Sequence, residues 1–191
     1  DAFALNGGGT MDFGTGDITI GASNVTSSSI TKTSGTVTFD SQKTGGQFFG
    51  TNLTSYGVHL NFGTSTVNFG PLTNGSSIGI EQHGSTDKTL TITADSVNYK
   101  NNGYIYQNST DNNKLKIIGD LVIDASKTVT TFHDSGADYG SLLEVTGDVT
   151  LNGKLNANSS ANPKTMTFGS LTIESGGEYD ATSGTTTIKG N

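Results

Sequence analysis

One recurring phrase constrains the fold of this chain more than any other feature. It consists of a glycine, a polar residue and a run in which apolar and polar residues alternate. It occurs as "GDITIG" at 16–21, "GDLVID" at 119–124, "GDVTLNGKL" at 147–155 and "GSLTIES" at 169–175. Alternation with a period of two puts apolar side chains on one face of a β-strand and polar side chains on the other. In 147–155 we therefore expect Val149 and Leu151 to point inward, and Thr150 and Asn152 to point outward.

The same alternation runs along the whole chain and predicts an all-β fold. Asn–Gly and Gly–Gly pairs separate several of the alternating segments, and these residues adopt the positive φ that tight corners require. The nearest approach to a helical pattern, at 138–147, contains Gly140 and β-branched neighbours that disfavour a helix. Predicted strands cover 11–13, 18–20, 36–40, 58–62, 66–70, 77–81, 89–94, 97–100, 104–107, 114–119, 121–124, 128–132, 141–145, 149–151, 154–157, 165–168, 171–174 and 185–190.

The distance between copies of the phrase indicates how these strands are arranged. The step from Gly119 to Gly147 is longer than the step from Gly147 to Gly169, but both fall in the range of solenoid repeats, about 20–30 residues. One coil of this length cannot bury its apolar side chains alone, but stacked coils bury them in a shared interior. We predict about seven to nine coils that form a rod about 40 Å long, at about 4.8 Å per coil. A β-sandwich or jelly roll is the alternative, because it also has many short alternating strands.

Composition argues against several classes of protein. The net charge is −7 and arginine is absent, whereas nucleic-acid binding requires a basic face, so no nucleic-acid partner is predicted. Cysteine is absent, which excludes disulfides, thiolate catalysis and cysteine-based metal sites. No apolar run of about 18 residues occurs, so no transmembrane segment is predicted. The first residues lack the basic start and apolar core of a signal peptide, and we expect residues 1–191 to be a single segment cut from a longer precursor.

Several phrases resemble the passenger domains of bacterial autotransporters, the proteins of type V secretion. They are "KIIGDLVIDAS" at 116–126, "GDVTLNGKLNANSS" at 147–160 and "FGSLTIESGGEYDATSGTTTIKGN" at 168–191. The resemblance is clearest over 114–191 and is closest to toxin-like passengers related to the vacuolating cytotoxin, with a looser likeness to large β-helical adhesins. It implies a right-handed parallel β-helix that is exported across the outer membrane and displayed at the cell surface. It also implies a membrane-anchored translocator domain outside this chain.

Polysaccharide-degrading enzymes also use β-helices, so we searched the sequence for paired carboxylates. Glycoside hydrolysis needs two positioned carboxyl groups. The candidates are Asp134, Asp138 and Glu144, with His133 as an acid–base neighbour and Tyr139 as an adjacent aromatic residue. We interpret "HDSGADYG" as a polar loop between two strands, although charge and an aromatic residue concentrate there more than elsewhere. The sequence therefore predicts no catalytic residue.

The remaining chemistry-bearing residues predict neither a metal site nor a cofactor site. His59 alternates with apolar neighbours and is expected to face solvent, and His83 is expected to lie in a turn, so the histidines lack metal-ligand spacing. The segment 7–17 has some likeness to a calcium-binding nonapeptide, but it has Thr10 where the repeat needs glycine, no tandem copy follows, and Asp12 alone supplies too few oxygen ligands. We predict a corner between coils there, without a metal or a phosphate.

Threonine pairs of the form T-x-T raise the question of ice binding. They occur at Thr36/Thr38, Thr89/Thr91/Thr93, Thr165/Thr167 and Thr185/Thr187. A flat threonine array requires nearly constant coil length, and the unequal steps between the glycines of the recurring phrase do not provide it. The β-propensity of threonine at outward positions is the simpler explanation.

Taken together, the residues and the resemblance predict a non-enzymatic segment of a secreted or surface-displayed passenger, an adhesin or a toxin-like colonisation and virulence factor. Its expected partner is a host cell-surface receptor or glycan, with self-association through the exposed strand edges at the two ends of the rod. The alternatives are a β-helical polysaccharide-degrading enzyme and a purely structural stalk.

Overall fold

The computed structural model is all-β and describes residues 3–5, 10–20, 23–25, 29–41, 47–52, 59–74, 78–83, 89–108, 114–133, 142–157, 165–181 and 184–190. No helix occurs in these ranges, and none is therefore long and apolar enough to cross a membrane. The strands are β1 (Phe3–Leu5), β2 (Thr10–Asp12), β3 (Ile18–Ile20), β4 (Ser23–Val25), β5 (Ser29–Thr31), β6 (Thr36–Ser41), β7 (Gln47–Asn52), β8 (His59–Asn61), β9 (Thr66–Asn74), β10 (Ile78–His83), β11 (Thr89–Tyr99), β12 (Gly103–Asn108), β13 (Lys114–Ile123), β14 (Thr128–His133), β15 (Leu142–Leu151), β16 (Lys154–Asn156), β17 (Thr165–Ile173), β18 (Glu178–Asp180) and β19 (Thr186–Ile188).

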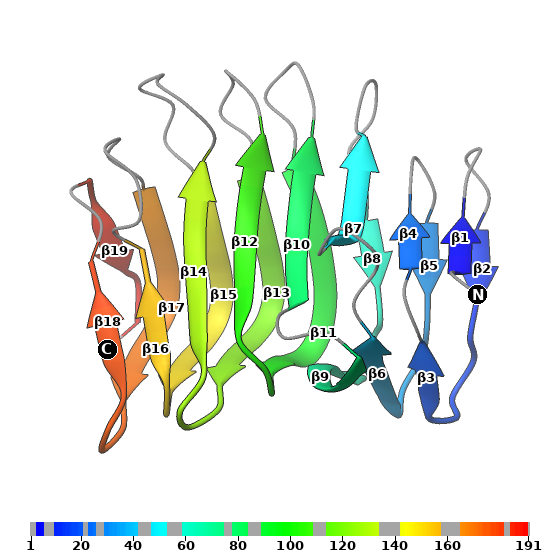
Figure 1. Ribbon diagram of the computed structural model, residues 1–191, viewed down its shortest axis with the longest axis horizontal. Coiled ribbons are helices and arrows are strands. Elements are labelled where there is room, and N and C mark those ends of the chain that lie inside the picture. The colour runs from blue at the N-terminus through cyan, green and yellow to red at the C-terminus, as the bar shows by residue number, and fades with distance from the viewer. Residues whose placement is uncertain are drawn as a thin grey trace.

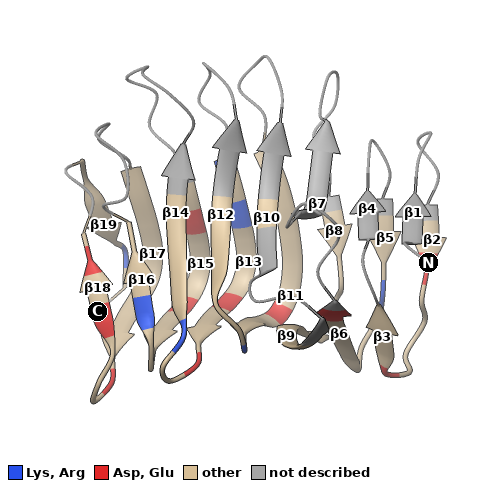
Figure 2. Ribbon diagram, in the orientation of Figure 1, with Lys and Arg blue, Asp and Glu red and all other residues tan. Residues whose placement is uncertain are grey.

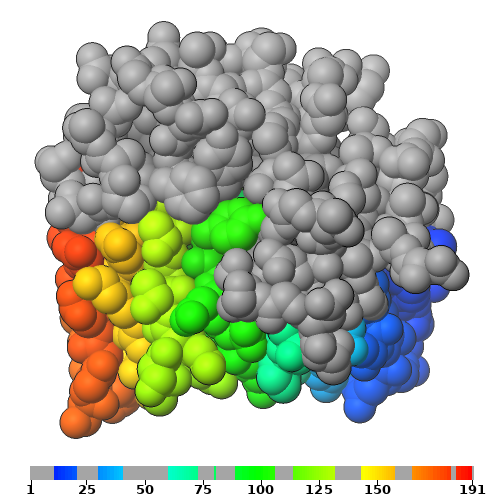
Figure 3. Space-filling view, viewed as in Figure 1, coloured from blue at the N-terminus to red at the C-terminus, as the bar shows by residue number. Residues whose placement is uncertain are grey.

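Every strand pair in the described part of the chain is parallel, and most strands belong to two sheets. The six-stranded sheet has the order β18-β16-β14-β12-β10-β7, and the long sheet contains β19, β17, β15, β13, β11, β8, β5 and β2 together with β9, β6 and β3. From β10 to β19, successive strands alternate between the two sheets. Figure 1 shows the six-stranded sheet in front of the long sheet, and Figure 3 shows the described residues following one another in sequence order from one end of the molecule to the other. This architecture is consistent with a parallel β-helix or solenoid, and it excludes the antiparallel sandwich for the described strands.

Residues that share a register position form apolar columns through the long sheet. One column contains Met11, Ile30, Leu60, Ile92, Ile117, Val145, Phe168 and Ile188. A second contains Ile20, Phe39, Phe69, Tyr99, Ile123, Leu151 and Ile173. The inner members of both columns are buried in one hydrophobic core. Each fully buried aliphatic or aromatic side chain of this kind stabilises the fold by about 1.5–3 kcal/mol.

The register confirms the spacings and the inward positions predicted for the recurring phrase. Leu121 pairs with Val149, and Val149 pairs with Leu171. Each of these residues follows the glycine of its own phrase by the same two positions, so the glycine-to-glycine step in the sequence equals the offset between paired strands. Val149 and Leu151 are fully buried, whereas the polar residues that follow each of them are only partly buried.

At 119, 147 and 169, the glycine that opens the phrase lies at a bend within a strand, which differs from the predicted break between two strands. The predicted segments 114–119 and 121–124 form the single strand β13, and 141–145 and 149–151 form the single strand β15. The predicted pairs 89–94 with 97–100 and 165–168 with 171–174 likewise merge into β11 and β17. Parallel pairing continues on both sides of each bend, with register shifts between Thr93 and Ser96 in β11 and between Val145 and Asp148 in β15.

Glycine is required at the bends of β13, β15 and β17 because each of them nearly touches the bend before it. Gly119 has a φ of 133°, and a Cβ atom there would overlap the carbonyl oxygen of Ala94. A Cβ atom on Gly147 would lie 2.6 Å from the carbonyl oxygen of Gly119, and one on Gly190 would lie 2.6 Å from the carbonyl oxygen of Gly169. No L side chain fits at such separations without movement of the backbone.

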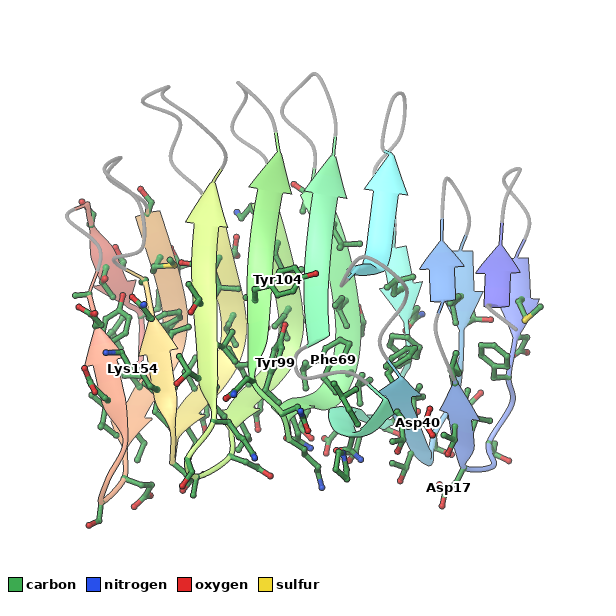
Figure 4. All side chains as sticks on the ribbon, viewed as in Figure 1. Asp17, Asp40, Phe69, Tyr99, Tyr104 and Lys154 are labelled. Atoms are coloured by element: carbon green, nitrogen blue, oxygen red, sulfur yellow. The ribbon has the colours of Figure 1, made fainter. Side chains whose placement is uncertain are left out.

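Aromatic side chains continue the core through the centre of the molecule. The ring centroids of Phe39 and Phe69 are 5.5 Å apart at an interplanar angle of 17°, and those of Phe69 and Tyr99 are 5.0 Å apart at 38°. These three residues are neighbours in one register column, and their exposed fractions do not exceed 1%. Figure 4 shows Phe69 and Tyr99 side by side between the two sheets. Aromatic pairs at these distances add about 0.5–1.5 kcal/mol beyond the burial of their area.

Candidate functional site

Only one of the carboxylates proposed as a catalytic candidate lies within the described residues. Glu144 is in β15, and His133 is the last residue of β14, where its backbone pairs with that of Gln107. Asp134, Asp138 and Tyr139 lie outside the described residues. The structure therefore tests the environment of Glu144 and leaves the polar loop 134–140 as a sequence-based hypothesis.

Glu144 forms ion pairs with two lysines of the neighbouring strand β13. Lys114 Nζ contacts Glu144 Oε2, and Lys116 Nζ lies 3.3 Å from Glu144 Oε1. The hydrogen bond from Lys114, followed by that from Lys116 and the charges of both lysines, lowers the pKa of Glu144 against the opposing effect of partial burial. A general acid in glycoside hydrolysis needs a raised pKa. Glu144 is thus held as an ionised partner of two lysines on the outer face of the long sheet.

A second group of charges joins the last two strands of the six-stranded sheet. Lys154 Nζ in β16 lies 2.7 Å from Glu178 Oε1 and 3.6 Å from Asp180 Oδ2, both in β18. The hydrogen bond to Glu178 is the main cause that raises the pKa of Lys154. Figure 4 labels Lys154 on this face of the molecule. Both charged clusters connect adjacent strands, so their first role is to join neighbouring turns of the chain.

Acidic residues at the bends of the long sheet bond to the next strand. Asp120 Oδ1 accepts a hydrogen bond of 2.8 Å from the backbone N–H of Asp148, and Asp148 Oδ1 accepts one of 2.6 Å from Ser170 Oγ. Asp17 Oδ1 accepts one of 2.7 Å from the backbone N–H of Thr36. Figure 2 shows acidic residues recurring along the edge that carries these bends. The described residues contain no group of three or more His, Asp or Glu side chains placed to hold a metal ion.

The two isolated histidines lie in different sheets. His59 is the first residue of β8 in the long sheet, and His83 is the last residue of β10 in the six-stranded sheet. The prediction of a turn at His83 is therefore wrong, because its backbone pairs with Asn52 on one side and Asn108 on the other. The sequence around a single histidine next to a glycine does not indicate whether the histidine ends a strand or lies in a turn.

Of the segment 7–17, which was predicted as a corner, residues 13–17 form a turn between β2 and β3. Thr10–Asp12 is strand β2, and Gly14 follows with a φ of 62°. Asp12 Oδ1 accepts a hydrogen bond of 2.9 Å from the backbone N–H of Gly14, so this carboxylate closes a local turn. Gly7, Gly8 and Gly9 lie outside the described residues.

The threonine pairs do not form one continuous line across the long sheet, although Thr167 pairs with Thr187 at its end. Thr91 pairs with Lys116 in β13, which pairs with Glu144 in β15, which pairs with Thr167 in β17. A lysine and a glutamate thus separate the threonines of β11 from those of β17. The flat array that ice binding requires is interrupted at the middle of the long sheet.

A line of polar residues on the six-stranded sheet escaped the sequence analysis. The register joins Tyr104 of β12, Thr130 of β14, Asn156 of β16 and Asp180 of β18. All four are partly exposed, while Ile105, Val129 and Leu155, which neighbour them along the chain, are buried. We call these four residues the polar strip. No repeated motif marks them in the sequence, because only the register between strands brings them together.

Comparisons with known proteins provide no relative for this chain. No protein-family model, no curated protein sequence and no solved structure matches it. The site and the function are therefore argued from the geometry of the described residues.

Proposed function

We propose that the chain is a right-handed parallel β-helix, closed on both sides of the two sheets. The hand is supported by the direction of the strands in Figure 1, where the front strands run upward, the rear strands run downward and the chain advances from right to left. Closure is supported on one side by the short turns that lead from the long sheet to the six-stranded sheet, at 100–102, 124–127 and 174–177. This winding would make the molecule a rigid rod.

The rod acts as a non-enzymatic segment of a secreted or surface-displayed autotransporter passenger, with an adhesin-like or toxin-like role in colonisation and virulence. The observation that carries the non-enzymatic part is the use of carboxylates. Glu144, Asp120 and Asp148 all bond to an adjacent strand, and Glu144 has a lowered pKa. Groups that join strands in this way stabilise the rod and are poorly suited to proton transfer. The sequence resemblance to autotransporter passengers supports the route to the cell surface.

The mechanism is geometric. A rod of stacked coils holds polar side chains on its faces at a fixed spacing of about 4.8 Å along its axis. Contacts with a host receptor or glycan would be distributed along one face and would not converge in a pocket. Rigid presentation lowers the entropy that is lost on binding, because the side chains are already ordered.

Flow cytometry with the purified, fluorescently labelled protein of residues 1–191 tests this function. We expect saturable binding to epithelial cells, which is lost after heat denaturation of the protein. Incubation of the folded protein with a panel of soluble polysaccharides should release no reducing sugar. Absence of saturable cell binding would refute the adhesin role, and reproducible sugar release would favour the enzyme alternative.

Self-association of rods through their ends is a second candidate, and the last coil favours it. Ile173 and Ile188 are 50% and 48% exposed, although the residues they pair with, Leu151 and Phe168, are fully buried. Ile188 sits on β19, which has no further partner strand on that side among the described residues. Ile173 sits on β17, whose pairing with β19 covers Met166–Phe168 and does not reach Ile173. Analytical ultracentrifugation of the Ile173→Lys and Ile188→Lys double variant tests this candidate, because added charge should abolish any oligomer that forms through this end.

A further inference from the structure

We infer that Lys32 sets the register between the first coil, which contains β2 and β3, and the second, which contains β5 and β6. It does so as a buried cation that finds its hydrogen-bond acceptor in one alignment only. Lys32 is 3% exposed, and it is the one charged side chain among the buried described residues. It follows β5 and lies two positions beyond Ile30, which is 1% exposed. The inference concerns how the coils pair, so it goes beyond the proposed function and does not depend on it.

Lys32 occupies a position that aromatic residues fill on both sides. The registers of β2, β5 and β8 continue into the residues that follow these strands, so Lys32 lies between Phe13 and Phe62. Phe62 is fully buried, and Phe13 is partly buried and packs against the core. An ammonium group in such surroundings destabilises a fold unless a partner satisfies it.

The partner of Lys32 belongs to the turn of the preceding coil. Lys32 Nζ donates a hydrogen bond to the carbonyl oxygen of Gly16, in the turn between β2 and β3. The ion pairs of the described residues do not include Lys32, so this carbonyl is its acceptor. The second coil is joined to the same turn once more, because the backbone N–H of Thr36 donates a hydrogen bond of 2.7 Å to Asp17 Oδ1. Figure 4 labels Asp17 at this turn.

Apolar residues alone do not fix this register. The strands β2 and β5 are three residues long, and each contributes one residue, Met11 or Ile30, to the apolar column that begins with Met11. A slip by one residue would turn the side chains to the other face, but a slip by two residues keeps them on the same face. After a slip by two, Phe13 would lie beside Ile30, and this contact is as apolar as the native one.

Lys32 distinguishes between these alignments. A slip by two residues displaces neighbouring strands by about 6.6 Å. It would carry Nζ away from the carbonyl of Gly16 and leave a buried ammonium group without an acceptor. The slipped register therefore carries the cost of an uncompensated charge, and the native register does not. Buried polar groups fix the register of coiled coils in the same way.

Engineered disulfides report the register, because the chain contains no cysteine of its own. Thr19 of β3 pairs with Thr38 of β6, and the two side chains are exposed and partly exposed, respectively. Cysteines at these paired positions would have Cα atoms about 4.8 Å apart, within the range of a disulfide. Thr19 and Thr36 are diagonal neighbours about 8 Å apart, beyond the usual limit of about 6.8 Å. Thr19→Cys with Thr38→Cys is thus the in-register pair, and Thr19→Cys with Thr36→Cys is the slipped pair.

Oxidation with diamide, followed by alkylation and intact-mass measurement, gives the fraction of the protein of residues 1–191 that carries each disulfide. In the parent background we expect the in-register pair to close and the slipped pair to stay open. Lys32→Met should lower closure of the in-register pair at least twofold and raise closure of the slipped pair. It should keep or raise the denaturation midpoint, because a buried charge is removed. Lys189→Met makes the same change at an exposed lysine and is the matched control, with both fractions expected as in the parent.

Unchanged closure of the in-register pair in folded Lys32→Met would overturn the register role. A lower denaturation midpoint with unchanged closure would have the same consequence, because Lys32 would then be an ordinary stabilising contact. Lys32→Leu is the second apolar variant if Lys32→Met does not fold, and failure of both variants to fold would also overturn the inference. None of these measurements involves cell binding, so the proposed function stands or fails separately.

Discussion

The two halves of the long sheet make the same bend in different ways. In the N-terminal region, a turn separates two strands at each bend, between β2 and β3, β5 and β6, and β8 and β9. In the C-terminal region, β11, β13, β15 and β17 pass through the bend as single strands of 9 to 11 residues. The apolar columns continue through both regions in one register. The core therefore requires aligned apolar columns, but the bend can be either a turn between two strands or a bend within one strand.

The chemistry that holds each kind of bend is also different. In the N-terminal region, Asp12 and Asn61 accept hydrogen bonds from the backbone N–H groups of Gly14 and Gly63, so a side chain closes the turns after β2 and after β8. In the C-terminal region, the backbones of Gly119, Gly147 and Gly169 pack against the preceding bend. Close contact between successive bends is nevertheless common to both regions, because a Cβ atom on Gly63 would overlap the carbonyl oxygen of Thr33 in the preceding turn. The regions therefore differ in the side chain that closes the turn and in the continuity of the strand. The four predictions that follow test this difference, from the largest effect to the smallest.

Phe69→Ala should have the largest effect, because Phe69 joins the two regions. Its ring lies between Phe39 of the N-terminal region and Tyr99 of the C-terminal region. Loss of a fully buried phenylalanine leaves a cavity and costs about 3–5 kcal/mol of unfolding free energy. Chemical denaturation monitored by circular dichroism measures this change. An equal loss of unfolding free energy in Phe13→Ala, at a partly exposed phenylalanine, would show that the aromatic stack does not contribute more to stability than other phenylalanines.

Gly119→Ala should cost about 3 kcal/mol, whereas Gly14→Ala should cost about 1–2 kcal/mol. Both glycines have a positive φ, but a Cβ atom on Gly119 overlaps the carbonyl oxygen of Ala94 and one on Gly14 meets nothing within 4 Å. The difference between the two variants measures the close contact at Gly119 together with its φ of 133°, which lies further from the left-handed helical region than the φ of 62° at Gly14. Similar midpoints of denaturation for the two variants would show that the contact between the bends at Gly119 and Ala94 is not tight.

Asn98→Ala should cost about 1–2 kcal/mol. Asn98 Nδ2 donates a hydrogen bond of 3.1 Å to Asn68 Oδ1, across the boundary between β11 and β9. Asn68 is only 8% exposed, so the loss of its donor leaves a poorly hydrated amide oxygen. A double-mutant cycle with Asn68→Ala isolates this bond, and the coupling should vanish if water replaces it.

Glu144→Gln should have the smallest effect, about 0.5 kcal/mol, because the ion pairs are close to the surface. The pKa of Glu144 is lowered in the folded protein by Lys114 and Lys116. Its contribution to stability is therefore present above the unfolded-state pKa of about 4.3 and is lost as the pH falls through the folded-state pKa. Denaturation midpoints of the parent and the variant should differ at pH 7 and converge in acid. A constant difference across this range would show that the charge of Glu144 is irrelevant.

Alternation and spacing were sufficient to predict much of the fold. The period of two identified Val149 and Leu151 as buried, and the distance from Gly119 to Gly147 equalled the offset between paired strands. Both signals are local or periodic, so they can be read from one sequence. Strands β1, β4, β5, β7 and β18 were missed, because their short segments alternate weakly.

The candidate site could not be predicted in the same way. The pairing of Glu144 with Lys114 and Lys116, and the alignment of Tyr104 with Asn156 through Thr130, depend on how coils of unequal length stack. The register shift between Thr93 and Ser96 shows how one additional residue at a bend changes the alignment. The sequence alone does not indicate which residues pair after such a shift.

Because the apolar columns keep one register from coil to coil, a whole coil can be removed without changing how the remaining coils pair. Because Ile117 occupies the position that Val145 occupies one coil later, removal of the segment 118–145 would bring Ile117 directly before Thr146 and leave every remaining column in phase. A chain shortened in this way should still fold, and it should be shorter by the thickness of one layer. A deletion that stopped one position short of this would instead put inward side chains on the outer face. The length of this protein can therefore be changed by one coil at a time.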